Sequence, residues 1–250
     1  MQYSSRFWLY LPFALVLALA AWVMGNWWLS ASALEKKLAA AKGTLVIPGI
    51  VVDWTSVTVG GFPFRIDATF TNLRISGAGA HGPFAWRTEK FALHALAYGG
   101  SRIVYEAAGP QQLAWTHKDG TGQKLDFVPG SLHASSITDA RGLARFDLDI
   151  VNVGSAQITA GRFQFHMRRE TESKTLKIMV QAETVQGSDA DQKLVQAYVD
   201  LSRLDSLMPL LEGKMSWPDA TTAWRSNGGK ASLSQTSAPD LAQTVLSNLY

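Results

Sequence analysis

The longest apolar stretch of the chain lies close to its N-terminus and contains no charged residue. It covers residues 7–29, with the sequence FWLYLPFALVLALAAWVMGNWWL. In helical form this stretch extends about 34 Å, which is enough to cross a bilayer core of about 30 Å. The pattern therefore predicts a transmembrane anchor over residues 7–29, preceded by a short cytoplasmic tail of residues 1–6.

Aromatic residues gather at both ends of this stretch. Indole and phenol rings settle at the headgroup level of a bilayer, because they combine an apolar body with a polar atom. We therefore expect two membrane-interface belts. They are formed by Trp8 and Tyr10 at one end and by Trp22, Trp27 and Trp28 at the other.

A cleaved signal peptide is the alternative interpretation of the same stretch. Arg6 is then its basic region, and residues 31–33 (Ala-Ser-Ala) form a small-residue cleavage site. The apolar part is longer than the h-region of about 7–15 residues that signal peptides use. Its length favours a permanent anchor.

The charges beside the stretch do not decide its orientation. Arg6 favours a cytoplasmic N-terminus, whereas Lys36, Lys37 and Lys42 favour the opposite orientation under the positive-inside rule. The rest of the chain has the character of a secreted β-rich domain, so we expect the N-terminus inside and the body outside. Both the anchor and the signal-peptide interpretations place the body outside the cytoplasm.

The hydrophobic pattern changes after a short segment of helix formers. Residues 34–42 (LEKKLAAAK) precede Gly43, which predicts a juxtamembrane helix over residues 30–43. From residue 44 onwards, apolar residues recur at every second position, the period of a strand with one buried face. The clearest runs are Phe62, Phe64, Ile66, Ala68 and Phe70; Ala144, Phe146, Leu148 and Ile150; Phe163, Phe165 and Met167; and Leu176, Ile178, Val180 and Ala182.

Turn signals such as Gly99-Gly100 separate the runs, so short turns are expected to join successive strands in an antiparallel meander. The alternation changes phase after Phe70, and a bulge at Asn72 would keep Leu73 pointing inward. We expect a mainly β fold with a few helices (α+β). Its centre is a long, twisted antiparallel sheet, an open barrel or groove, in one domain over residues 44–250.

The last quarter of the chain returns to helical spacing. Apolar residues over 190–211 predict an amphipathic helix that covers part of the sheet. Residues 214–217 and 222–233 are expected to form short strands, with a hairpin turn at 227–229 (Asn-Gly-Gly). Residues 240–249 are expected to form a closing helix.

The residue types present argue against most kinds of catalysis. The chain of 250 residues has no cysteine, which excludes disulfides, thiolate metal sites and thiol nucleophiles. Its five histidines lack the spacing of metal ligands, and no phosphate-binding loop or nucleophile elbow occurs. Asp147 and Asp149 share a strand face with Arg145, which fits a solvated polar face better than a catalytic pair. We expect no catalytic residue, no metal, no cofactor and no enzymatic activity.

The charge balance is mild. Only Arg6 of the 23 basic residues precedes the apolar stretch, so the 22 that follow exceed the 20 acidic residues by two. These charges are spread along the chain, and the pair Arg168-Arg169 is followed at once by Glu170. Nucleic-acid binding needs a dense basic patch, so we expect no nucleic-acid partner.

The apolar residues of the alternating strands are the strongest candidates for a binding site, although the simpler interpretation places them in the core. A groove left open on the concave face of a twisted sheet would bind an acyl chain or an apolar partner segment. The candidate groove residues are Phe62, Phe64, Ile66, Phe70, Phe146, Leu148, Phe163, Phe165 and Ile178.

Residues 52–54 (VDW), followed by residues 59–65 (VGGFPFR), resemble a known bacterial family, domain of unknown function 2125, common in alphaproteobacteria. Its members share an N-terminal apolar segment, a short helix, a GFPFR segment and a long β-rich remainder. Residues 224–229 (WRSNGG) are a second, less specific point of similarity. The family has no established activity. The resemblance implies a protein anchored in the inner membrane of a Gram-negative envelope, with its body in the periplasm.

Two functions fit these observations. In the first, the body is a non-enzymatic periplasmic module that binds lipid or another apolar ligand in its β groove. The alternative is a structural or interaction protein that docks envelope partners through a sheet edge or through the helix expected at 190–211. The bilayer is a partner in both.

Overall fold

A computed structural model describes residues 6–79, 82–117, 119–154, 159–172, 174–186 and 192–236. The helices described are α1 (Arg6–Ala41), α2 (Leu204–Leu211) and α3 (Trp217–Ser226). The strands are β1 (Thr44–Ile47), β2 (Ile50–Asp53), β3 (Ser56–Gly60), β4 (Arg65–Ala78), β5 (Pro83–Leu96), β6 (Arg102–Thr116), β7 (Gly122–Phe127), β8 (Ser131–Asp139), β9 (Gly142–Gly154), β10 (Thr159–Glu170), β11 (Thr175–Gln186), β12 (Gln192–Leu201) and β13 (Ala231–Thr236).

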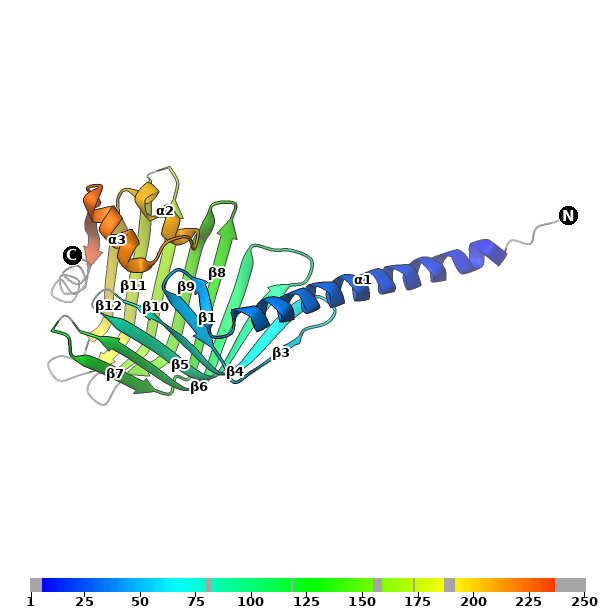
Figure 1. Cartoon of the computed structure of the whole chain (residues 1–250), viewed down its shortest axis with the longest axis horizontal. Coiled ribbons are helices and arrows are strands. Elements are labelled where there is room, and N and C mark those ends of the chain that lie inside the picture. Colours follow the sequence, from blue (N-terminus) through cyan, green and yellow to red (C-terminus); the bar gives the residue numbers. More distant parts are fainter. Residues whose placement is uncertain are drawn as a thin grey trace.

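The strands form one 13-stranded antiparallel sheet, in the order β1-β2-β4-β5-β6-β8-β9-β10-β11-β12-β13. Strand β3 pairs with β4, and β7 pairs with β6. Successive strands are mostly neighbours, as the short turns predicted. The sheet is open, and Figure 1 shows α1 leaving it as a long, nearly straight rod. The predicted mainly β fold with a few helices is therefore confirmed.

The sheet bends along a line that crosses its three long strands β4, β5 and β6. On β4, Asn72 adopts φ 53°, and the buried face changes from Phe70 to Leu73, as predicted. On β6, Gly109 adopts φ 81°, beside a register shift between Thr88 and Lys90 of β5. Positive φ at these positions turns the strands without unpairing them. The β5–β7 region consequently crosses in front of the later strands (Figure 1).

Helices α2 and α3 cover one end of the apolar sheet face (Figure 1). Leu204, Leu207 and Leu211 of α2 are buried in a cluster that includes Trp224 of α3. The indole Nε1 of Trp224 donates a hydrogen bond to the carbonyl oxygen of Ser202 at 2.6 Å. The two helices therefore close a core over β9–β13.

The secondary structure predicted after residue 190 was wrong in three places. Of the helix expected at 190–211, residues 192–201 form strand β12, and only residues 204–211 are helical, as α2. Leu194, Tyr198 and Leu201 have the spacing of one helix face, whereas Val195, Val199 and Leu201 have the spacing of one strand face and pair with β11. Tertiary pairing decided between the two.

Strands were also expected at 214–217 and 222–233. The first segment leads into α3, and of the second only residues 231–233 form a strand, at the start of β13, because α3 extends to Ser226. Ser216 caps α3, because its Oγ accepts a hydrogen bond from the backbone N–H of Asp219 at 3.4 Å, and Pro218 follows in the first turn. Residues 227–229 end α3 instead of forming a hairpin turn, with Gly229 N–H donating to the carbonyl oxygen of Trp224. The helix expected at 240–249 lies outside the described residues.

Candidate membrane interface

The first half of α1 stands away from the sheet and exposes its apolar side chains. Trp8, Leu15 and Leu19 are at least 60% exposed. The helix is continuous from Arg6 to Ala41, so the spanning and juxtamembrane segments expected from the sequence form one element. Among the described residues, this helix is the one long and apolar enough to cross a membrane.

The second half of α1 is docked on the sheet. Leu34, Leu38 and Ala41 pack against a buried cluster that includes Trp54 and Phe70. Ala31, one turn before Leu34, is only 5% exposed. Packing of this kind fixes the direction in which the bare half of α1 leaves the body.

Polar and aromatic contacts secure the point where α1 meets the sheet. The Trp27 indole Nε1 donates to the carbonyl oxygen of Arg65 at 2.7 Å, and its ring meets the Phe62 ring edge-on at 5.5 Å. Trp22 stacks on Tyr98, with ring centroids 6.1 Å apart. The Tyr98 hydroxyl donates to the carbonyl oxygens of Pro63 at 2.8 Å and Val23 at 3.3 Å. Two of these four rings come from α1 and two from the body, so together they form one junction between α1 and the body.

Large apolar side chains surround this junction and face outward. Phe62 is 53% exposed, Phe64 66%, Leu96 61% and Tyr98 44%, all in or beside the β3–β4 and β5–β6 connections. The two connections are joined, since the N–H of Ala97 donates to the carbonyl oxygen of Phe64 at 3.0 Å. We call the outward-facing set the collar. Its members are Trp22, Trp27, Trp28, Phe62, Phe64, Leu96 and Tyr98.

Comparison with family models gives one match, to an uncharacterised protein family conserved in bacteria (DUF2125), over residues 27–242. The chain belongs to the DUF2125 family. Comparisons with curated proteins and with solved structures give no match.

The segment that carried the family resemblance in the sequence lies in the collar. The DUF2125 match begins at Trp27 and includes residues 61–65, so it covers the docked half of α1, the junction and nearly all of the sheet. Leu96 and Tyr98 complete the collar but were not foreseen. The signal that could have found them is an apolar pair placed just before the Gly99-Gly100 turn.

Phe62 and Phe64 lie where the period-two pattern did not place them. The pattern made them the first buried positions of a strand, but β4 begins at Arg65 and both residues precede it in a turn. Arg65 N–H donates to the carbonyl oxygen of Gly61 at 2.9 Å, which closes that turn. The alternation begins before the backbone joins the sheet at Arg65, so the two rings are exposed.

The remaining candidate groove residues lie inside the body. Phe146, Phe165 and Ile178 pack against the cluster beneath α2 and α3. Leu148 and Phe163 belong to a second cluster with Ala107, Leu132 and Ile150. Ile66 and Phe70 are 9% and 5% exposed. At these positions the candidate groove residues, partly or fully buried, pack against other side chains of the DUF2125 body.

A larger hollow on the body has a different character. It measures about 1030 Å³ and lies along the bend of the sheet. Its lining includes Arg74 and Arg87, which are paired directly across β4 and β5, and buried Gln111. Gln111 is internally satisfied: it donates to Thr88 Oγ1 at 2.8 Å and accepts from the Trp86 indole at 3.1 Å. This mixed polar lining does not match an apolar ligand.

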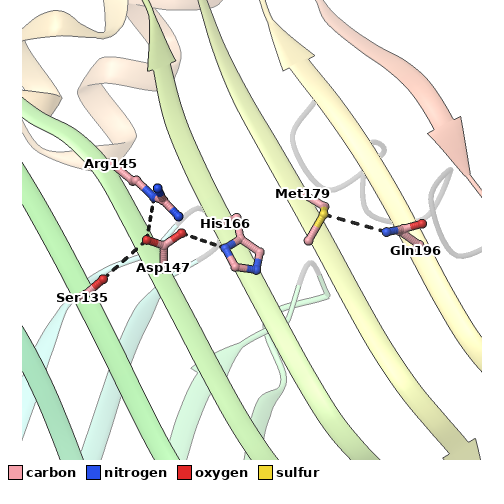
Figure 2. A network of polar contacts seen from close by, with 6 residues as sticks. All are labelled: Ser135, Arg145, Asp147, His166, Met179 and Gln196. Carbon is pink, nitrogen blue, oxygen red and sulfur yellow. Dashed lines mark hydrogen bonds and ion pairs between the residues drawn. The ribbon is translucent and has the colours of Figure 1, made fainter.

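A polar network crosses the opposite face of β8–β10 (Figure 2). Asp147 accepts hydrogen bonds from His166 Nδ1 at 2.7 Å, Arg145 Nε at 2.7 Å and Ser135 Oγ at 3.4 Å. A Ser-His-Asp triad places the imidazole between hydroxyl and carboxylate, whereas here the carboxylate is in the middle. No described group of three His, Asp or Glu side chains is arranged to hold a metal ion. The network can link neighbouring strands of the sheet.

Hydrogen bonds on this polar face of the sheet lower the pKa of two carboxyl groups, those of Asp147 and Asp149. At Asp147, partial burial raises the pKa, but hydrogen bonds from His166 and Arg145 outweigh burial, and the net pKa lies below its usual value. At Asp149, the hydrogen bond from Arg162 is the main cause of a lowered pKa. A carboxyl group whose pKa is lower in the folded than in the unfolded state stabilises the fold when it is ionised. This stabilisation is fully present at pH values above the unfolded pKa of about 3.9. That stability is lost as pH falls through the folded values.

We expect the double variant Asp147→Asn and Asp149→Asn to be less stable than the wild type near neutral pH and to lose less stability on acidification. The two stability curves should converge only after the pH has fallen through the lowered folded pKa values, where the native carboxyl groups are protonated as well. The measurement is the thermal midpoint of the detergent-solubilised protein as a function of pH. Glu172→Gln, an exposed carboxylate outside the network, should follow the wild-type curve. Parallel curves for the double variant and the wild type would contradict this account.

Proposed function

We propose that this DUF2125 protein is a non-enzymatic, single-pass inner-membrane protein whose body lies in the periplasm and contacts lipid. The observation that carries the proposal is the collar. It continues the bare apolar surface of α1 onto the body at one end of the sheet, where Phe62 and Phe64 face outward. A surface of this kind is stable when a membrane covers it.

The position of the collar along α1 matches the edge of a bilayer. From Trp8 to Trp28 the helix rises about 30 Å, which is the thickness of the hydrocarbon core. Trp27 lies at the far end of that span and Trp22 about 8 Å before it, and their ring partners Phe62 and Tyr98 lie at the same two levels. The body would then rest on the headgroup layer with the sheet rising from it.

A permanent anchor fits the structure better than a cleaved leader. Residues 31–33 lie inside α1, where Ala31 is buried against the body. A mature chain starting at Leu34 would also lack Trp22 and Trp27, and with them the stacking and the hydrogen bond that hold α1 to the collar. The docked helix therefore supports retention of the whole segment.

Single-cysteine labelling tests the location of the body, and the natural chain offers a cysteine-free background. Lys124→Cys on β7 should react with a membrane-impermeant maleimide in intact spheroplasts. Gln2→Cys in the N-terminal tail should react only after the membrane is permeabilised. The reverse pattern would contradict the proposed orientation.

An interaction role is the second candidate, and the edge strand β1 favours it. Leu45, Val46 and Ile47 are 65%, 50% and 40% exposed on β1, which pairs with β2 at the start of the sheet. Exposed apolar edge strands are sites of strand addition by a partner. The helix that this hypothesis also offered, at 190–211, is divided between strand β12 and the short helix α2. In-cell crosslinking from Val46→Cys should recover a defined envelope protein if β1 is the docking edge, and recovery of lipid alone would contradict it.

A further inference from the structure

The junction between α1 and the collar contains a hollow on its membrane-facing side. Its volume is about 540 Å³, within the range of about 300–1,000 Å³ typical of small-molecule sites. The residues that line it are Ala21, Met24, Gly25, Trp27, Trp28 and Phe62. Five come from α1 and one from the body, so the hollow exists only because the body docks on the helix.

All of its lining side chains are apolar. Asn26, the polar residue in this turn of α1, folds back and donates to the carbonyl oxygen of Trp22 at 3.0 Å. Gly25 forms an open floor, because a Cβ added there would meet no atom within 4 Å. Glycine inside a helix costs about 1 kcal/mol relative to alanine. Among the described residues, no atom fills the space beside Gly25.

The geometry points to a bilayer acyl chain as the occupant: we infer that the hollow holds one acyl chain of a phospholipid in the leaflet nearest the body. This inference rests on the proposed anchor. The hollow continues the exposed surface of the spanning helix, and Met24, Trp28 and Phe62 are all more than half exposed toward the same surroundings. Its place at the end of a span of about 30 Å is where acyl chains meet their headgroups.

A second copy of α1 fits the hollow less well. Ala21 and Gly25 have the small-xxx-small spacing that lets helices approach closely. Trp28 follows Gly25 by three positions and therefore lies on the same helix face. Phe62 closes the body side. A helix about 10 Å wide would have to pass both rings, whereas a flexible acyl chain can end against them.

The test uses the full chain in proteoliposomes that contain a phosphatidylcholine with a photoactivatable diazirine within one acyl chain. After irradiation, mass spectrometry should find adducts on the peptide that contains Phe62 and on residues 24–28, in addition to general labelling of residues 12–20. Gly25→Leu, which fills the hollow, should reduce the Phe62 adduct about tenfold relative to the residue 12–20 adducts. Ala20→Leu adds the same kind of bulk to α1 outside the hollow and should leave that ratio unchanged.

Phe62→Ala provides a second variant, because removing the body-side wall should lower the adducts on residues 24–28. Unchanged adduct ratios in both variants would overturn the inference while leaving the anchor intact. Crosslinks between two copies through residues 21–25 would overturn it in favour of a helix dimer. Absence of labelling over residues 12–20 as well would overturn the anchor, and the inference with it.

Discussion

Two arginines placed near the middle of α1, Leu15→Arg together with Leu19→Arg, are expected to remove most of the protein from the membrane fraction. Both leucines are about 60% exposed on the bare half of the helix. An arginine at the centre of a spanning helix costs about 2.5–3.5 kcal/mol, so the pair costs about 5–7 kcal/mol. This penalty is larger than the stabilisation that leucine at the same two positions provides. Fractionation of cells after carbonate washing measures the effect.

The control is Val128→Arg, which places an arginine on an exposed apolar residue of the body. Val128 is 67% exposed and lies between β7 and β8. This variant should remain in the membrane fraction at the wild-type level. Retention of the doubly substituted protein in washed membranes would mean that something other than α1 holds the body there.

Trp224→Ala is expected to cause the largest loss of folding stability, about 3–5 kcal/mol. Trp224 is 3% exposed in the cluster that joins α2 and α3 to the sheet. Its removal leaves a cavity and leaves the Ser202 carbonyl oxygen without its 2.6 Å hydrogen bond. Gly229 lies directly against the indole, too close for any Cβ, so the surrounding backbone is shaped around this ring.

The loss should appear as a lower midpoint of thermal unfolding of the detergent-solubilised protein. Trp217→Ala is the control, because Trp217 is 37% exposed at the start of α3 and its side chain contributes less buried area. Its midpoint should stay close to that of the wild type. Equal losses in both variants would show that α2 and α3 do not form a packed core over β9–β13.

The sheet was predictable because its strands are amphipathic with period two. Phe146, Leu148 and Ile150 alternate with Arg145, Asp147 and Asp149, and the structure places the two sets on opposite faces. The phase change at Asn72 was readable for the same reason, since only a backbone irregularity keeps Leu73 buried after Phe70. Local pattern and tertiary burial agree in these strands.

The segments after residue 190 were less predictable because their apolar spacing fits two structures. Leu194, Tyr198 and Leu201 would line one face of a helix, Val195, Val199 and Leu201 one face of a strand, and pairing with β11 selected the strand. The helix α3 could have been found from Ser216, which has Pro218 two positions later and Asp219 three positions later, a typical helix start.

The collar could not be assembled from the sequence. Trp22, Phe62 and Tyr98 are separated by tens of residues, and only the docking of α1 against the β3–β4 and β5–β6 connections brings them together. The alternation at Phe62 and Phe64 suggested that both rings are buried. A sequence pattern does not show at which residue the chain joins its sheet, and here β4 begins only at Arg65. A binding face was expected in the middle of the sheet, and exposed apolar surface lies instead at the end that meets α1.

The most direct test of the central claim, that α1 is a retained anchor, is the intact mass of the native protein extracted from membranes. The account predicts a chain that still carries residues 7–29, with a mass close to the 27.2 kDa of the full sequence. A mature chain beginning at Leu34, recovered from the soluble periplasmic fraction, would contradict it.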